Sequence, residues 1–198
     1  NSENFLERSL MRIGIGLSLL PFLGLILNLF HIPIDWRIIL GLSVLYPVFY
    51  LIRHRPKPGF KLKVTKTDIS IFVMLAIFAA NFYVYVTGAF SYPYLEDDDS
   101  WGHSQTAKFF SIEKNVFSDL GNRIRYLNPY PPTYSIIMGI LHQTNDSIYW
   151  TLKFFNALIV SLSTIFFYFF VKEFSGSRNK ALFASFSLSY IPDFLSHF

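Results

Sequence analysis

Long apolar runs limit what this chain can fold into. Five of them alternate with polar segments, at residues 10–30, 36–52, 69–90, 148–171 and 181–195. A helix needs about 20 mostly apolar residues to cross the ~30 Å hydrocarbon core of a bilayer, and the runs are near that length. Charged residues make up only 15% of the chain, against about 25% in a soluble domain. We therefore predict an all-α integral membrane protein with about five transmembrane helices.

Basic residues are concentrated in two of the segments between these runs. Residues 53–68 hold six of them against a single acid, and residues 172–180 form a second, shorter basic segment. Membrane proteins keep Lys- and Arg-rich loops in the cytoplasm, so both segments and the N-terminus are predicted to be cytoplasmic. Residues 91–147 then lie on the external side. This orientation accounts for the net charge of +4, and no nucleic-acid partner is predicted. Lipid headgroups are an alternative partner of the first basic segment.

The external segment is predicted to contain juxtamembrane helices. Apolar residues recur in it at intervals of three and four, which is typical of an amphipathic helix lying on a membrane surface. They are Phe109, Ile112, Val116 and Leu120. We expect a helix of about five turns, from near Ser100 to a stop at Gly121 and Asn122. Residues 134–141 are apolar but too few to span, and predict a second short helix.

Four consecutive carboxylates, Glu96, Asp97, Asp98 and Asp99, follow the third apolar run directly. Adjacent carboxylates repel each other, so at least one should have a raised pKa unless a cation screens them. One carboxylate can act as a general base towards an acceptor hydroxyl. Alternatively, Asp97, Asp98 and Asp99 can hold a divalent cation, Mg²⁺ or Mn²⁺, through oxygen ligands. The two plainer alternatives are a helix N-cap at Asp99 or Ser100 and a solvated loop end.

Other candidate site residues lie close by in the sequence. His103 is four residues after Asp99, so both can share one face of a helix. Trp101 is either an anchor at the membrane interface or a platform for a sugar. Arg123 and Arg125 can grip a phosphate, or they can meet lipid headgroups. The chain has no Cys, which excludes a Cys nucleophile, a thiolate metal site and a disulfide.

The order of these elements resembles the GT-C superfamily of integral membrane glycosyltransferases. The matching stretches are Glu96-Asp97-Asp98-Asp99-Ser100-Trp101-Gly102-His103 and Asn128-Pro129-Tyr130-Pro131-Pro132-Thr133-Tyr134. Asp99-Ser100-Trp101 is similar to the Asp-Pro-Trp of oligosaccharyltransferase catalytic subunits. The Tyr-Pro-Pro stretch looks more like the protein-mannosyltransferase and lipid-sugar-transferase branches. This chain has Ser100 where Pro is usual, and three Asp where one or two suffice.

The resemblance implies that a sugar is moved from a polyprenyl phosphate or pyrophosphate donor to an acceptor on the external or lumenal face. In the mannosyltransferase-like branches the Asp of the first loop is the base, and in the oligosaccharyltransferases it binds a divalent metal. Asp99, Asp98 and Asp97 are then the catalytic candidates. The substrate-binding candidates are Glu96, Trp101, His103, Arg123, Arg125 and Tyr130.

The chain is predicted to divide near residue 68. Residues 1–68 supply two extra N-terminal helices and the basic cytoplasmic loop, and residues 69–198 begin the GT-C-like core with its catalytic loop at 91–147. We expect the N-terminal part of a longer enzyme, inactive alone, with its second acidic motif further on. The rival interpretations are a transporter or channel with an acidic vestibule that attracts cations, and a module that only anchors partners. A transporter favours ionisable groups near the bilayer midplane, and the apolar runs hold none centrally.

Overall fold

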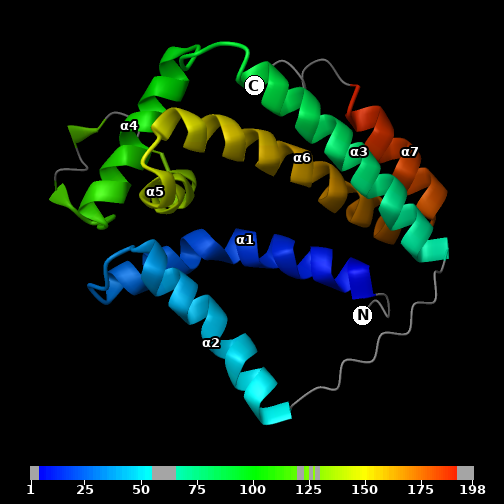
Figure 1. Cartoon of the computed structure of the whole chain (residues 1–198), viewed down its shortest axis with the longest axis horizontal. Helices are drawn as coiled ribbons and strands as arrows, with labels where there is room; N and C mark the ends of the chain where they lie inside the picture. Colours follow the sequence, from blue (N-terminus) through cyan, green and yellow to red (C-terminus); the bar gives the residue numbers. More distant parts are fainter. Residues whose placement is uncertain (1–4, 55–65, 120–122, 125–126, 128–129, 191–198) are drawn as a thin grey trace. The chain divides into compact units, whose positions relative to one another are not determined.

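The computed structural model describes the chain except residues 1–4, 55–65, 120–122, 125–126, 128–129 and 191–198. In the part it describes, every regular element is a helix (Figure 1). In chain order the helices are α1 (Phe5–Leu29), α2 (Trp36–His54), α3 (Lys66–Ala89), α4 (Asp98–Glu113), α5 (Thr133–Asn145), α6 (Ile148–Ser175) and α7 (Arg178–Leu188). The all-α prediction is confirmed.

Four helices are long and apolar enough to cross a membrane, namely α1, α2, α3 and α6. They correspond to the first four apolar runs. The fifth run begins in α7, which has 11 residues, and the end of that run lies outside the described residues. Four candidate spans are roughly consistent with the prediction of about five. Helices α4 and α5 are too short to be candidates, as the sequence predicts.

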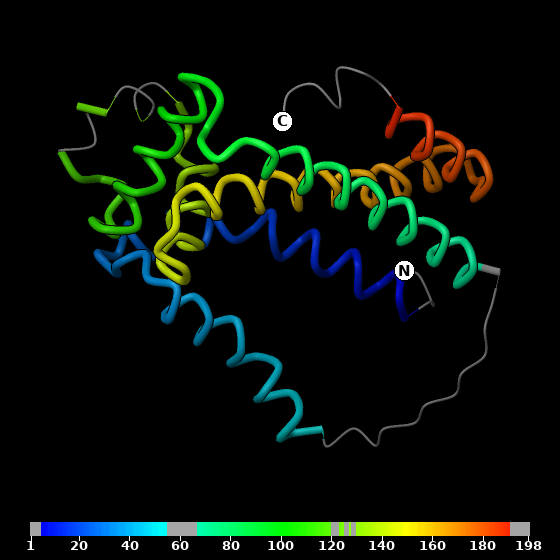
Figure 2. Tube along the Cα trace, turned by 45° about the horizontal axis from the view of Figure 1, so that its top comes forward, coloured from blue at the N-terminus to red at the C-terminus, as the bar shows by residue number. Residues whose placement is uncertain are grey.

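The chain forms two compact units, and each is described by itself. The first unit comprises residues 1–16, 63–94 and 152–198. Its core contains Met74 of α3, Ala181 of α7 and three residues of α6, which are Ile165, Tyr168 and Phe169. Helices α3 and α7 lie side by side in both views (Figures 1 and 2), and Asn81 donates a hydrogen bond of 2.8 Å to the Ser189 hydroxyl.

Two lysines of α6 make polar contacts within the first unit. Lys172 Nζ lies 2.6 Å from Glu7 Oε1, which ties the last turn of α6 to the first turn of α1. Lys153 is only 9% exposed and donates to the carbonyl oxygen of Tyr92. Its ammonium also lies 5.8 Å from the centroid of the Phe90 ring. Lys153 therefore ties α6 to the segment that follows α3.

The second unit comprises residues 17–62 and 95–151. Its core contains Ile34, which precedes α2, Ile39 of α2, Phe110 of α4, and Ile136 and Ile140 of α5. Helices α4 and α5 lie against each other (Figure 1), because small residues let their backbones approach. A methyl group on Gly139 would lie 2.9 Å from Phe110 Cβ and 3.1 Å from the Ala107 carbonyl oxygen.

Helix α4 differs from its prediction in its end and in its buried face. The predicted stop at Gly121 and Asn122 lies outside the described residues, and the helix already ends at Glu113, because Lys114 adopts the left-handed conformation with φ of 53°. Val116 is therefore outside the helix, and Ile112 is 65% exposed. The buried stripe recurs every four residues, at Gly102, Thr106 and Phe110. The helix buries this stripe because α5 covers it.

Candidate active site

Asp97 begins helix α4. Its backbone is extended, with φ −134° and ψ 169°, and its Oδ1 accepts a hydrogen bond of 2.7 Å from the Ser100 backbone N–H. This is the N-cap arrangement, which satisfies one of the four amide groups that lack a partner at a helix start. An N-cap at Asp99 or Ser100 was one of the alternatives that the sequence left open, and the cap lies instead at Asp97.

The cap also sets the acidity of Asp97. The Ser100 backbone N–H and then the Ser100 hydroxyl stabilise its ionised form, so the pKa of Asp97 is lowered. The charge that His103 can carry acts in the same direction. For Asp97, this is the opposite of the raised pKa expected from crowding. A lower pKa makes Asp97 a weaker proton acceptor, so we do not place the base there.

Asp98 and Asp99 occupy the first turn of α4. Negative charge is favourable there, because the amide dipoles of a helix leave partial positive charge at its N-terminus. Both residues are exposed, as are Glu96 and Asp97, so the whole acidic run faces solvent. Asp99 and His103 lie four residues apart within α4 and share one face, as predicted.

Aromatic rings surround His103. The centroid of its ring lies 5.0 Å from that of Tyr134 and 6.5 Å from that of Tyr130, both in edge-to-face orientation. Tyr130 is 55% exposed. The structure therefore brings together His103 and Tyr130, two predicted site residues that are far apart in the sequence, and adds Tyr134 to them.

Trp101 lies on the other side of the first turns of α4. Its ring is 41% exposed, and its centroid lies 5.7 Å from that of Tyr149 in an edge-to-face contact. Tyr149 belongs to the first turn of α6, which begins at Ile148. The exposed part of the indole offers an apolar face next to the acidic run.

A buried hydrogen bond joins the middle of α4 to the start of α5. The hydroxyls of Thr106 and Ser135 lie 2.8 Å apart, and their residues are 0% and 4% exposed. A hydroxyl pair of this kind is satisfied only at one register of the two helices, so it specifies how they pack. Neither residue was singled out in the sequence, because nothing local distinguishes them from other Ser and Thr residues.

The two arginines are not placed in this site by the structure. Arg123 is exposed, and Arg125 lies outside the described residues. Within the described residues, no group of three or more His, Asp or Glu side chains is arranged to hold a metal ion. The cap bond also occupies one oxygen of Asp97. A divalent cation at Asp97, Asp98 and Asp99 stays a prediction from the sequence.

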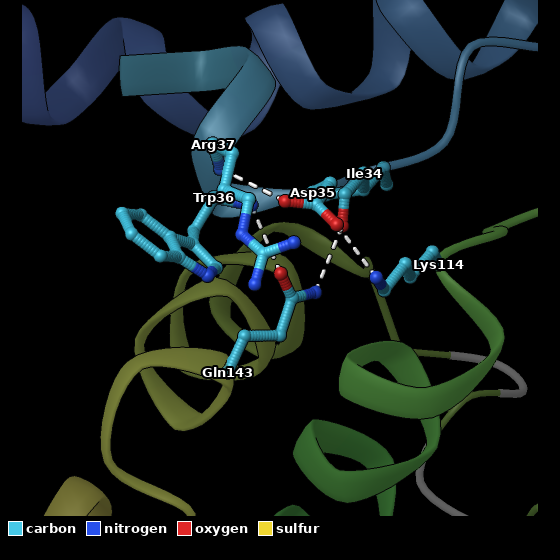
Figure 3. A network of polar contacts seen from close by, with 6 residues as sticks. All are labelled: Ile34, Asp35, Trp36, Arg37, Lys114 and Gln143. Atoms are coloured by element: carbon cyan, nitrogen blue, oxygen red, sulfur yellow. Dashed lines mark hydrogen bonds and ion pairs between the residues drawn. The ribbon is translucent and has the colours of Figure 1, made fainter. Parts of the chain in front are cut away.

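Sequence reasoning also missed a polar junction between α4, α5 and the segment that joins α1 to α2. Asn28, Asp35, Lys114 and Gln143 form it, and Figure 3 shows its central part. Asn28 sits at the end of an apolar run and Gln143 at the end of a short apolar helix. A polar residue at the end of an apolar segment indicates a side chain that needs a hydrogen-bond partner, but the sequence does not identify that partner.

Comparison with known proteins places this site in a family. Residues 69–197 match the family described as dolichyl-phosphate-mannose-protein mannosyltransferase, a family of the GT-C superfamily. The match takes in α3 to α7, including the acidic run and both juxtamembrane helices, and leaves α1 and α2 outside. No curated protein and no solved structure matches the chain. Since more than half of the chain is matched, it belongs to the dolichyl-phosphate-mannose-protein mannosyltransferase family of membrane glycosyltransferases.

Proposed function

We propose that this chain carries the catalytic loop of an enzyme that moves a sugar from a polyprenyl phosphate to an acceptor hydroxyl on the external or lumenal face of the membrane. One observation supports this most strongly. The exposed carboxylates stand at the first turn of a short helix, next to an aromatic cluster, within the residues that match the family. The family description makes a mannosyl group the first donor sugar to test.

Asp99 is the proposed base. Asp97 is committed to the helix cap, whereas Asp99 shares a helix face with His103 and its ring neighbours. The Asp99 carboxylate accepts the proton of the acceptor hydroxyl as the acceptor oxygen attacks C1 of the sugar. The bond between C1 and the phosphate oxygen breaks, and polyprenyl phosphate leaves. General-base assistance of this kind contributes about 10²–10⁴-fold to a rate.

Recognition of the donor is assigned to the other candidate residues predicted from the sequence. The rings of Trp101 and Tyr130 offer exposed apolar faces for a sugar, and Glu96 offers a carboxylate to its hydroxyls. His103, Arg123 and Arg125 are the proposed contacts of the phosphate. A divalent cation at Asp97, Asp98 and Asp99 remains a prediction from the sequence.

Transfer by the full-length protein tests this function. Membranes that contain it are supplied with polyprenyl phosphate bearing radiolabelled mannose, and both released polyprenyl phosphate and labelled acceptor are measured. We expect both products to depend on the protein. If the donor stays intact, with mannose and with other sugars on the same carrier, the proposed function is wrong.

A further inference from the structure

The segment between α1 and α2 is bonded to the end of α4 through Asn28. The Asn28 side chain donates to the carbonyl oxygens of Ile32 and Lys114, at 3.3 and 3.2 Å, and accepts from the Val116 N–H at 2.7 Å. Asn28 is 5% exposed. One buried amide thus joins α1, the turn after it and the chain just past α4. The Ile34 N–H adds a direct backbone bond of 2.9 Å to the Lys114 carbonyl.

Gln143 bonds the same segment to α5. Its Oε1 accepts from the Trp36 N–H at 2.9 Å, and its Nε2 donates to the Ile34 carbonyl oxygen at 2.8 Å (Figure 3). Trp36 is the first residue of α2, so its N–H has no partner within that helix. Gln143 therefore supplies from α5 a bond that the start of α2 requires.

Asp35 completes the junction with two different bonds. Its Oδ1 accepts from the Arg37 N–H at 2.9 Å and so caps α2, while its Oδ2 lies 2.6 Å from Lys114 Nζ. The Lys114 ammonium and the Arg37 N–H lower the pKa of Asp35, which favours its ionised form. The Asp35 side chain is 16% exposed, so water screens this pair only in part.

These bonds connect a part of the chain that matches the family with a part that does not. Helices α1 and α2 lie outside the residues that match the family and are candidate membrane spans, whereas α4 and α5 lie inside the match and carry the site. The bonds are directional, and several end on backbone groups, namely the N–H groups of Trp36 and Val116 and the carbonyl oxygen of Ile34. The apolar contacts of Ile34, Phe110 and Ile136 hold the α4–α5 pair against α1 and α2. The hydrogen bonds and the ion pair add directional constraints, so they restrict the pair to one position more strictly than the apolar contacts alone.

We propose that Asn28, Asp35 and Gln143 are positioning residues, which hold the α4–α5 pair on the α1–α2 helices so that the acidic end of α4 is correctly placed for transfer. The part of this proposal that concerns transfer rests on the proposed function. Helix α4 has 16 residues and is about 24 Å long. A tilt of about 5° at its clamped end would move Asp99 by about 2 Å, and a misplacement of about 1 Å can cost about 10²-fold in rate.

The test combines a distance with a rate, in the full-length protein reconstituted in vesicles. Spin labels are attached at Phe30 and Ile112, which are 73% and 65% exposed, in a chain segment that has no native Cys. Gln143→Ala removes both bonds to the α1–α2 segment. Asp35→Asn keeps an oxygen for the Arg37 N–H but removes the charge of the pair. The matched controls are Gln105→Ala and Asp119→Asn, which alter exposed residues of the same types.

We expect Gln143→Ala and Asp35→Asn to broaden the distribution of label distances and to lower kcat about 10²-fold, with KM for the polyprenyl-phosphate sugar changed less than about twofold. Lys114→Asn, which suits the left-handed backbone, should match the loss in Asp35→Asn, and the double variant should lose no more than either single one. An unchanged distance distribution would show that the junction does not hold α4 in place, and the proposal would be wrong. A broadened distribution with unchanged kcat would overturn its positioning role.

Failure of the proposed function gives a different result. The wild-type protein would then transfer no sugar from any polyprenyl-phosphate donor, while the distance distributions still decide whether the clamp holds α4. The two controls should reproduce the wild-type distances and rates. If they broaden the distribution as much as the test variants do, the effect is not specific to the junction and the proposal is wrong.

Discussion

Lys114 and Asp35 are 79 residues apart in the sequence, and their side chains form an ion pair of 2.6 Å (Figure 3). Lys114 directly follows α4, and Asp35 directly precedes α2. If the candidate spans α1 and α2 both cross the membrane, the segment between them lies at one of its faces, and this contact then predicts the end of α4 at the same face. The basic-loop pattern of the sequence independently predicts that these two segments share a side.

The orientation of the chain in the membrane can be measured directly. His31, Asp119 and Asn179 are exposed in the structure, and each is replaced in turn by a single Cys. We expect the first two to react with a membrane-impermeant thiol reagent in intact cells, and the third to react only after the membrane is permeabilised. Labelling at Asn179 with protection at Asp119 would reverse the orientation and remove the external site.

The contact between α4 and α5 should be sensitive to one added methyl group. In Gly139→Ala the new Cβ would meet Phe110 Cβ at 2.9 Å and the Ala107 carbonyl oxygen at 3.1 Å, so the helices must separate. We expect a loss of about 1–3 kcal/mol in the free energy of unfolding. Gly41→Ala is the matched control, since nothing lies within 4 Å of its Cβ, and it should stabilise α2 by about 0.5–1 kcal/mol. Thermal unfolding of the purified protein in detergent compares them, and equal effects would contradict the close packing.

Acid should weaken the same pair of helices through His142. Burial lowers the pKa of His142, which is 5% exposed; Asp146 acts against this shift and Lys108 adds to it. The unfolded chain therefore binds a proton more readily than the folded protein does, and stability falls as the pH drops below about 6.5. His142→Leu should remove this loss between pH 7.5 and pH 5.5 in thermal unfolding. If the wild-type protein and His142→Leu lose the same stability in acid, a group other than His142 causes the loss.

The spans were predictable because length and hydropathy alone decide them, and α1, α2, α3 and α6 follow the apolar runs closely. The end of α4 was not predictable in the same way. Lys114 takes a left-handed conformation that Gly or Asn usually occupies, and its ion pair with Asp35 and the bonds to its carbonyl hold it there. Those partners come from a distant part of the chain.

The site was predictable in its residues and not in their roles. The acidic run was recognisable from its position after a span, and so was the shared face of Asp99 and His103. That Asp97 caps the helix depends on where α4 starts, and the sequence offers several adjacent Asp and Ser residues that can each cap a helix. The clamp formed by Asn28 and Gln143 depends on backbone partners that only the folded chain brings together.

Removal of divalent metal separates the two chemical interpretations of the acidic run. A general base at Asp99 needs no cation, so the base mechanism predicts that transfer persists in the presence of a chelator. Single-turnover transfer with and without chelator measures this. Loss of transfer that is restored by Mg²⁺ or Mn²⁺, and Asp→Asn variants that need more metal, would show instead that Asp97, Asp98 and Asp99 share a cation.

The role of Asp99 is tested most directly by the single-turnover rate of Asp99→Asn in the full-length protein, with a polyprenyl-phosphate sugar as donor. Asparagine keeps the shape and hydrogen bonding of the side chain but cannot take the proton. The base mechanism predicts a fall of about 10²–10⁴-fold in rate with donor binding unchanged. Asp97→Asn should cost far less, since asparagine caps a helix about as well as aspartate, and Asp119→Asn serves as the exposed control. Wild-type rates in Asp97→Asn, Asp98→Asn and Asp99→Asn alike would contradict a catalytic role for the acidic run.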